Sequence, residues 1–363
     1  MTDRSRAYID DQFDLFLPYL SDLPFRDQRE VMERPFFSLA KRKRLKPIDY
    51  SSPDGKVWVH VSANPDYGMA TIWDADILIY CASVISDMAR RGVNDIPRTL
   101  NVMPYDILRT IGRPTTGRAY DLLGNALDRL VSTTIKTNIR AENRRETTFS
   151  WLDSWTQLVD EKTERSKGMS LSLSGWFYDG LLMKGGILAI DPAYFKLTGG
   201  RERWLYRVAR KHAGGAGAGG FAISLPTLFE KSGAEGVYRR FKFEIIAIVK
   251  RDALPSYSLS LEDSPRGGEP KLRMTRRMAA PDQVADTIPI RAAAAPANTN
   301  RQAYLTDETL EEARATYPGW DIHAVHETYR KWLMSKDAAP PKHYQRAFLG
   351  FLKSYHERHK HEL

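Results

Sequence analysis

Two stretches of this chain repeat one order of sequence patterns, and this repetition constrains the fold more than any other feature. In the first stretch, MPYDILRTIG predicts a short helix that ends at Gly112, and GRPTTG forms a polar turn after it. A second helix follows, with an apolar face that packs inward and a polar face that is free to bind. The inward stripe of that helix, at spacings of three and four, comprises Tyr120, Leu123, Leu127 and Leu130.

Strand patterns follow this amphipathic helix. TTIKTNI has the alternating pattern of a strand, and TTFSWLDSWTQLV is a second strand pattern. The polar turn RAENRRE separates them. Helix, turn, helix and two-stranded wing is the order of a winged helix, in which the second helix enters the DNA major groove and the wing lies along the backbone. One such segment can occur by chance in any protein with helices and strands, so a single copy decides little.

A second copy makes a tandem winged-helix protein the more economical interpretation. A helix is predicted over residues 201–212, Leu225 and Leu228 lie in a short helix that ends at SG, and GAEGV is the turn. The strand YSLSL closes this unit. The inward positions of its second helix are Tyr238, Phe241, Ile245 and Val249. The predicted fold class is therefore α+β, with tandem winged-helix domains and a small C-terminal all-α module on a flexible linker.

The charge of the chain suits a polyanionic partner, since the formal net charge is +9 and the isoelectric point is near 9.4. No apolar run approaches the roughly 20 residues that span a bilayer, and the start MTDRSRAYIDDQF lacks the core of a signal peptide. We therefore expect a cytoplasmic protein with no membrane contact. The single cysteine, Cys81, excludes an intramolecular disulfide framework, and its apolar surroundings predict a buried thiol.

Motifs for catalysis or cofactor binding are weak in this chain. HAGGAGAGG has the glycine spacing of a dinucleotide fingerprint. That fingerprint follows a strand and precedes a helix, whereas HAGGAGAGG follows a predicted helix and precedes a predicted strand, which favours a linker. Asp74 and Asp76 form a DxD motif at the head of a predicted helix, where acids more often complement the helix dipole than bind a metal. The phosphate-binding pattern GxxxxGK[ST] does not occur. We predict no enzymatic activity, no cofactor and no metal.

The phrases LDRLVSTTIKTNI and DALPSYSL give the chain a resemblance to a known family. Over about residues 25–265 the sequence resembles the plasmid replication initiator protein A family. The resemblance implies a tandem winged-helix initiator that binds repeated sites, called iterons, in a plasmid origin and helps to open it for theta replication. It also implies a switch between a repressing dimer and an initiating monomer.

The predicted domain division follows changes in composition along the chain. Residues 1–55 are predicted to form an N-terminal basic extension, 56–172 the first winged-helix domain and 173–263 the second. Residues 264–301 are rich in Pro and Ala and predict a flexible linker. Residues 302–363 predict a small helical C-terminal domain.

Candidate DNA contacts are basic or polar residues near the second helices, around the predicted wing and in a basic run at the N-terminal side. In the first winged helix they are Arg113, Thr115, Thr116, Arg118, Asn125, Arg129, Lys136, Arg144 and Arg145. In the second winged helix they are Arg239, Arg240 and Lys242. The basic run, which is either a phosphate-contacting arm or a solvated loop, comprises Lys41, Arg42, Lys43 and Arg44.

Aromatic and basic residues are interleaved in the predicted C-terminal helices. Most of the rings are expected to form a core, and the alternative is stacking on single-stranded bases or contact with a helicase. The candidates for that contact are Trp320, Tyr329, Arg330, Lys331 and Trp332.

The predicted function is a plasmid replication initiator that binds repeated origin sequences, promotes origin opening and recruits the host helicase. The alternative is a winged-helix transcriptional regulator that does not melt its DNA. The expected partners are double-stranded origin DNA, single-stranded DNA, the host initiator and helicase, and a second copy of the chain in a homodimer.

Overall fold

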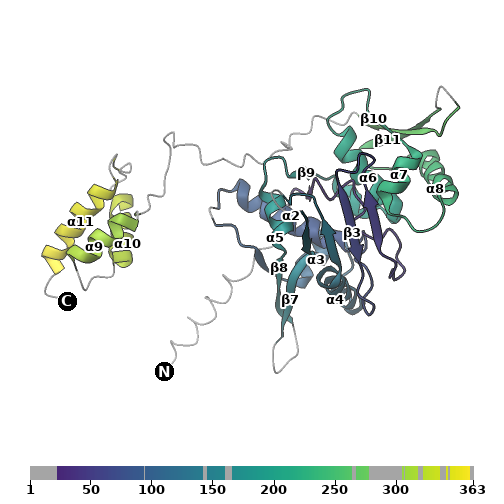
Figure 1. The fold of residues 1–363 in the computed structure, drawn as a ribbon. Coiled ribbons are helices and arrows are strands. Elements are labelled where there is room, and N and C mark those ends of the chain that lie inside the picture. The colour runs from purple at the N-terminus through teal and green to yellow at the C-terminus, as the bar shows by residue number, and fades with distance from the viewer. Residues whose placement is uncertain are drawn as a thin grey trace. The chain divides into compact units, whose positions relative to one another are not determined.

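The structure is a computed structural model that divides the chain into two compact units, Met1–Ile290 and Arg291–Leu363, shown as ribbons in Figure 1. In the first unit it describes residues 23–277 except 94, 142–144, 160–165 and 264–266. In the second unit it describes residues 305, 307–317, 322–335, 341 and 344–359. Within the described helices, none combines the length and the hydropathy that a bilayer crossing requires.

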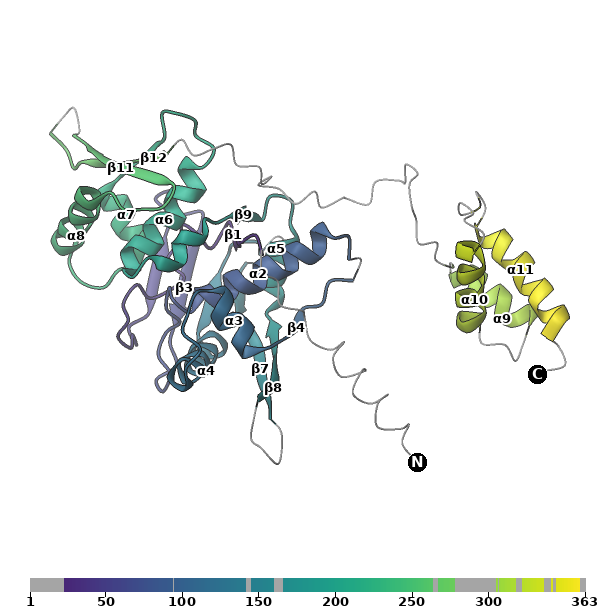
Figure 2. The same ribbon diagram turned by 180° about the vertical axis from the view of Figure 1, so that it is seen from behind.

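The first winged helix follows the chain order helix, strand, helix, helix, strand, strand (Figure 2). Its elements are α2 (Ala75–Arg90), β4 (Thr99–Val102), α3 (Pro104–Thr110), α4 (Gly117–Ser132), β7 (Leu152–Val159) and β8 (Ser166–Leu173). The strands form an antiparallel sheet in the order β4-β8-β7. Helices α3 and α4 are the helix-turn-helix, and β7 with β8 is the wing, so α4 is the recognition helix of this unit.

The second winged helix repeats this order. Its elements are α6 (Gly200–Ala213), β10 (Phe221–Ser224), α7 (Leu225–Ser232), α8 (Tyr238–Arg251), β11 (Tyr257–Glu262) and β12 (Lys271–Arg276). The strand order β10-β12-β11 matches that of the first sheet position by position, and α8 is the recognition helix. The predicted α+β fold with tandem winged helices is confirmed.

Glycines end the first helix of each helix-turn-helix. Gly112 follows α3 with a φ of +69°, and Gly233 follows α7 with a φ of +56°, which are left-handed conformations that favour glycine. At Gly233 the space is also closed, because an added Cβ would lie 2.6 Å from the Cβ of Pro35. The turn before α8 is thus set by conformation and by close packing against the N-terminal part of the chain.

The wing of the first unit is not the strand pair that the sequence predicts. TTIKTNI forms β5 (Thr134–Thr137), which joins a different sheet of order β2-β3-β5-β6. TTFSWLDSWTQLV is divided between β6 (Thr147–Phe149) and β7, and β7 pairs with β8 instead. Alternating side chains identify a strand but not its partner, and several nearby strands were available. The predicted pairing of TTIKTNI with the start of TTFSWLDSWTQLV is confirmed, because β5 pairs with β6, but the wing was wrongly assigned to these strands, since it consists of β7 and β8.

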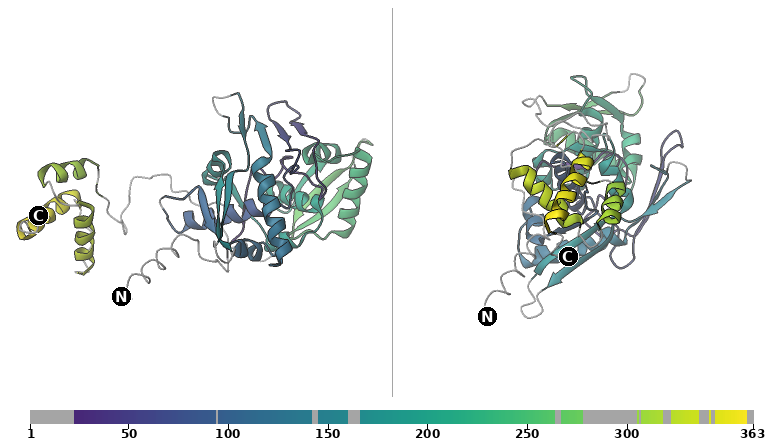
Figure 3. Two further views of the ribbon diagram at one scale, coloured as in Figure 1. Left: turned by 90° about the horizontal axis from the view of Figure 1, so that it is seen from below. Right: turned by 90° about the vertical axis from the view of Figure 1, so that its left-hand side faces the viewer.

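Residues 23–55, predicted as part of a basic extension, belong to the core of the first unit. Strand β1 (Arg26–Gln28) pairs with β9 (Ile187–Ala189), and β2 (Ile48–Ser51) pairs with β3 (Trp58–Ser62). In Figures 1 and 3 the purple strands of this segment lie between the blue elements of the first winged helix and the teal to green elements of the second one. Phe36 and Phe37 of the same segment are buried in one cluster with Ile48 and Val59. The many charges of this segment conceal its apolar positions in the sequence.

The boundaries between the winged helices and the linker also differ from the predicted ones. Helix α5 (Gly175–Leu182), β9 and the short helix η1 (Pro192–Lys196) connect β8 to α6. Strand β12 lies inside the range 264–301 that the sequence assigns to a linker, because the second wing continues past residue 263. Residues 264–266 and 278–301 of that range lie outside the described residues.

Two buried clusters form the core of the first unit, and α2 contributes to both of them. Ile77 and Leu78 pack in the cluster of the first winged helix, whereas Ile79 packs in the cluster around α6 and α8. Trp151, which is fully buried, stacks on Phe37 with ring centroids 4.7 Å apart. Because one helix serves two cores, a displacement of one winged helix against the other disturbs close-packed side chains.

The C-terminal unit has a core of its own. Its helices are α9 (Asp307–Thr316), α10 (Ile322–Ser335) and α11 (Tyr344–His359). Phe348 and Leu352 of α11 are fully buried, and Tyr329 of α10 packs on Phe348 with ring centroids 5.8 Å apart.

Candidate nucleic-acid interface

Recognition helix α4 presents a polar face to solvent. Its buried stripe includes Leu123 and Leu127, which hold the helix on the core. Arg118 and Asn125 are exposed on the opposite side, and they lie seven residues apart and therefore on one face of the helix. Thr115 and Thr116, in the turn before the helix, are exposed as well. Four of the predicted contacts are therefore accessible to a DNA groove.

Recognition helix α8 carries its cations in the same part of the helix. Arg239 and Arg240 in its first turn are exposed. Arg240 donates from Nε to Glu244 at 3.0 Å, one turn further on, which places its guanidinium along the helix surface. Lys242 is half-buried and donates to Glu269 beside the wing, at 2.7 Å. Arg239 and Arg240 are accessible, and Lys242 is tied to the wing.

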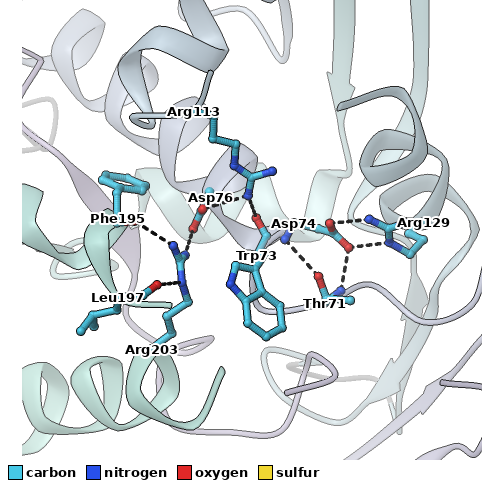
Figure 4. Close-up of polar contacts among 9 residues, drawn as sticks. All are labelled: Thr71, Trp73, Asp74, Asp76, Arg113, Arg129, Phe195, Leu197 and Arg203. Carbon is cyan, nitrogen blue, oxygen red and sulfur yellow. Dashed lines mark hydrogen bonds and ion pairs between the residues drawn. The ribbon is translucent and has the colours of Figure 1, made fainter. Parts of the chain in front are cut away.

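Two arginines predicted to contact DNA instead bind buried carboxylates (Figure 4). Arg129 donates from Nε and Nη2 to both carboxylate oxygens of Asp74, at 2.8 and 2.7 Å. This hydrogen-bonded pair raises the pKa of the Arg129 guanidinium. Arg113 donates from Nη2 to the Trp73 carbonyl at 2.6 Å and to Asp76 at 3.0 Å. Both arginines fix the recognition helix within the protein, so the structure gives each of them a structural role.

Asp76 joins the two winged helices. Its carboxylate, 1% exposed, accepts from Arg113 before α4 and from Arg203 of α6 at 2.6 Å. Arg203 also donates to the Leu197 and Phe195 carbonyls, at 2.7 and 3.1 Å. Burial raises the pKa of Asp76, and the two guanidinium groups act in the opposite direction. One carboxylate therefore links the turn before the first recognition helix to the first helix of the second winged helix.

A second carboxylate ties the N-terminal segment to the second winged helix. Glu33 accepts from His212 at 2.7 Å, from Lys231 at 2.6 Å and from Lys211. Burial acts to raise the pKa of Glu33, but the hydrogen bonds and charges of these partners outweigh it and hold the pKa far below its ordinary value. Asp27 is likewise buried and accepts from Arg207 of α6 at 2.6 Å. These ion pairs connect α6 and α7 to the β1 region.

The predicted basic run divides into exposed and buried residues. Lys41, Arg42 and Lys43 are exposed. Arg42 pairs with Glu235 in the α7–α8 turn at 2.9 Å, and Lys43 donates to the Asp66 carbonyl at 2.8 Å. Arg44 is 5% exposed and donates to the Gly233 carbonyl at 2.6 Å, so it holds that turn.

Residues predicted to lie at the first wing occupy the β5–β6 hairpin instead. Lys136 of β5 is half-buried and pairs with Glu146 at 2.7 Å. Arg145 is exposed beside that hairpin, and Arg144 lies outside the described residues. Because this hairpin is not the wing, these three positions lose the argument that placed them next to DNA.

The wings themselves hold features that the sequence analysis missed. In the first wing, Trp155 of β7 donates from Nε1 to Asp128 of α4 at 3.0 Å, which fixes the wing against the recognition helix. In the second wing, KLRMTR alternates basic and apolar residues, with Leu272 and Met274 buried and Lys271 exposed. That alternation was visible in the sequence, but the adjoining Pro and Gly residues favoured a linker.

Of the two aromatic candidates that the structure describes in the C-terminal unit, one is core and the other is exposed. Tyr329 is 2% exposed, whereas Trp332 is 42% exposed and stacks against Tyr329 with ring centroids 6.0 Å apart. Trp320 and the side chains of Arg330 and Lys331 lie outside the described residues. Of the predicted single-strand contacts, Trp332 is thus the accessible one among those described.

Comparison with known proteins places these helices in a family. A family model described as Replication initiator protein A matches residues 26–259, which is more than half of the 363-residue chain. The chain belongs to the replication initiator protein A family. The match contains both recognition helices, α4 and α8, and ends within β11, before the C-terminal unit begins.

A curated relative of this replication initiator protein A member agrees with the family model. A putative replication protein of Wigglesworthia glossinidia brevipalpis is 33% identical over 239 residues, covering 65% of this chain and 84% of the relative. Two structures of RctB domains 2 and 3 resemble it at 15% identity. The selenomethionine derivative has a TM-score of 0.47 and covers 66% of this chain and 94% of that one. The other, RctB-155-483, has a TM-score of 0.44, with 67% and 95% covered.

Proposed function

We propose that this family member initiates plasmid replication by binding repeated duplex sites, the iterons, in an origin with α4 and α8 and by promoting opening of the adjacent DNA. In this proposal it acts by binding alone, without catalysis, and the host helicase is then recruited to the opened strands. The observation that carries the proposal is the pair of recognition helices with exposed Arg118 and Arg239, in two winged helices that Asp76 joins.

The coupling of the two winged helices supports opening of DNA rather than simple attachment. Two recognition helices on a stiff body engage the duplex at a spacing that the protein sets. If the relaxed duplex does not match that spacing, binding energy is used to bend it, at a cost of order 1–6 kcal/mol. A·T-rich DNA next to a strained site is the easiest to unstack. Salt bridges such as that between Asp27 and Arg207 resist a deformation of the protein that would let the DNA stay relaxed.

A transcriptional regulator with the same fold remains the alternative, and melting of DNA separates the two. We expect the protein, bound to a supercoiled plasmid that carries its own origin, to make thymines beside its binding sites reactive to permanganate. A regulator protects its site and leaves the neighbouring bases paired. The measurement is a permanganate footprint with the host initiator protein present.

A matched control uses the variant Arg118→Ala, Arg239→Ala, which should give neither protection nor reactive thymines. Protection of the binding sites by the wild-type protein without any reactive thymine, on the same supercoiled template, would contradict origin opening and favour the regulator.

The C-terminal unit is proposed to contact single-stranded DNA or the host helicase. Since it has its own core and lies outside the family match, we expect a chain that ends at Ile290 to bind duplex repeats with nearly full affinity but to fail to maintain the plasmid. Affinity is measured by gel shift and maintenance by plasmid retention in growing cells. Normal retention of the plasmid by the shortened protein would show that the unit is dispensable.

A further inference from the structure

Both recognition helices carry a large apolar side chain in solvent. Phe243 of α8 is 73% exposed, the largest fraction among the large apolar side chains that the structure describes, and Leu122 of α4 is 51% exposed. Their positions correspond, because Leu122 is the sixth residue of α4 and Phe243 the sixth residue of α8. In each helix the second residue is an exposed arginine, Arg118 or Arg239, one turn earlier on the same face.

The fold does not need these side chains where they are. In α8 the core is formed by Phe241, Ile245 and Ile248, and Phe243 points away from that stripe. A single exposed apolar residue has no special meaning on a protein surface. The same residue class at the same position of two recognition helices, one turn after an arginine in both, is a repeated arrangement and points to a shared ligand.

The surroundings of Phe243 indicate that the ligand is duplex DNA. Arg239 precedes it on the exposed face, while Lys242 is drawn toward Glu269 beside the wing and Arg240 toward Glu244. Phe243 and Arg239 therefore share one exposed face of the first two turns, beside Arg240, which is also exposed. A guanidinium suits the acceptor oxygen and nitrogen of guanine, and the apolar feature that the major groove offers is the 5-methyl group of thymine.

We propose that Phe243 and Leu122 determine sequence specificity by packing on thymine 5-methyl groups, each in the groove segment read by its own helix. The inference rests on the proposed function, since it requires that α4 and α8 enter the major groove. It adds that each binding site contains a thymine about one helical turn of protein away from the base or phosphate bound by the arginine. Uracil at that thymine pairs identically but lacks the methyl group.

The test uses the full-length protein and duplexes that it selects from a randomised pool. Each thymine of the selected duplex is replaced in turn by deoxyuridine, and affinity is measured by fluorescence anisotropy. We expect at least one replacement to weaken wild-type binding about four-fold, which corresponds to the burial of one methyl group. Phe243→Ala should weaken binding to the thymine duplex and be insensitive to that replacement, while Phe243→Leu should keep part of the sensitivity.

The possible outcomes separate the inference from the proposed function. If the protein selects no sequence from the pool, both fail. If it selects a sequence but Phe243→Ala responds to every replacement as the wild-type protein does, sequence-specific binding stands and the thymine contact is overturned. If Phe243→Ala instead changes the oligomeric state in sedimentation, the exposed ring is a contact between copies of the chain, which also overturns it.

Discussion

Replacing Asp76 with asparagine is expected to lower the free energy of unfolding by about 3–5 kcal/mol, the usual result of removing one partner of a buried ion pair. The carboxylate is 1% exposed, and the side chain of Arg203 that it binds is 5% exposed. Without the negative charge, the Arg203 guanidinium keeps only neutral acceptors, namely the carbonyls of Leu197 and Phe195 and the asparagine amide oxygen. Its charge is then buried without compensation. Urea unfolding followed by tryptophan fluorescence measures the loss.

A matched control is Asp66→Asn, the same chemical change at an exposed aspartate. It should change the free energy of unfolding by less than about 0.5 kcal/mol. The double variant Asp76→Leu, Arg203→Met removes both charges and should lose less than Asp76→Asn alone. An unfolding midpoint for Asp76→Asn equal to that of Asp66→Asn would mean that this network does not hold the winged helices together.

The helices of both winged units could be predicted from the sequence because their signals are local. Buried residues recur every three or four positions in α4 and α8, and Gly112 and Gly233 mark the turns. The pairing of strands could not be predicted in the same way. The sequences of β5 and β7 do not identify their partners, because the choice of β3 or β8 depends on contacts far apart in the chain.

In the candidate interface too, local features could be predicted from the sequence and partners distant in the chain could not. Arg118 and Arg113 lie five residues apart in one basic turn, and nothing local distinguishes them. Their roles differ because Asp76, 37 residues before Arg113, is buried behind the turn and takes its guanidinium. The structural roles of Arg129 and Arg44 could not be predicted for the same reason, since Asp74 and the Gly233 carbonyl are distant in sequence. The strongest candidates for DNA contact are therefore exposed arginines of the recognition helices that bind no buried acceptor.

Arg118 and Arg239 pass this criterion, because both are exposed in the first turn of a recognition helix. Replacing both with alanine is therefore expected to weaken binding to the selected duplex by about 2–6 kcal/mol if each forms a bidentate pair with guanine. The two effects should add, since the arginines lie on separate helices with no shared partner. If they contact phosphates instead, the slope of log K against log salt should become smaller by about two, one for each lost contact, and sequence preference should persist.

Gel shifts over a range of salt concentrations distinguish these cases, and a charge-matched control isolates position from net charge. Lys184→Ala with Lys196→Ala also removes two positive charges from exposed sites, but outside the recognition helices. Long-range attraction to DNA falls equally in both double variants, so any additional loss in the arginine variant measures direct contact. Equal affinity and equal salt slope for the two double variants would remove α4 and α8 from the interface, because the arginines would then act through net charge alone.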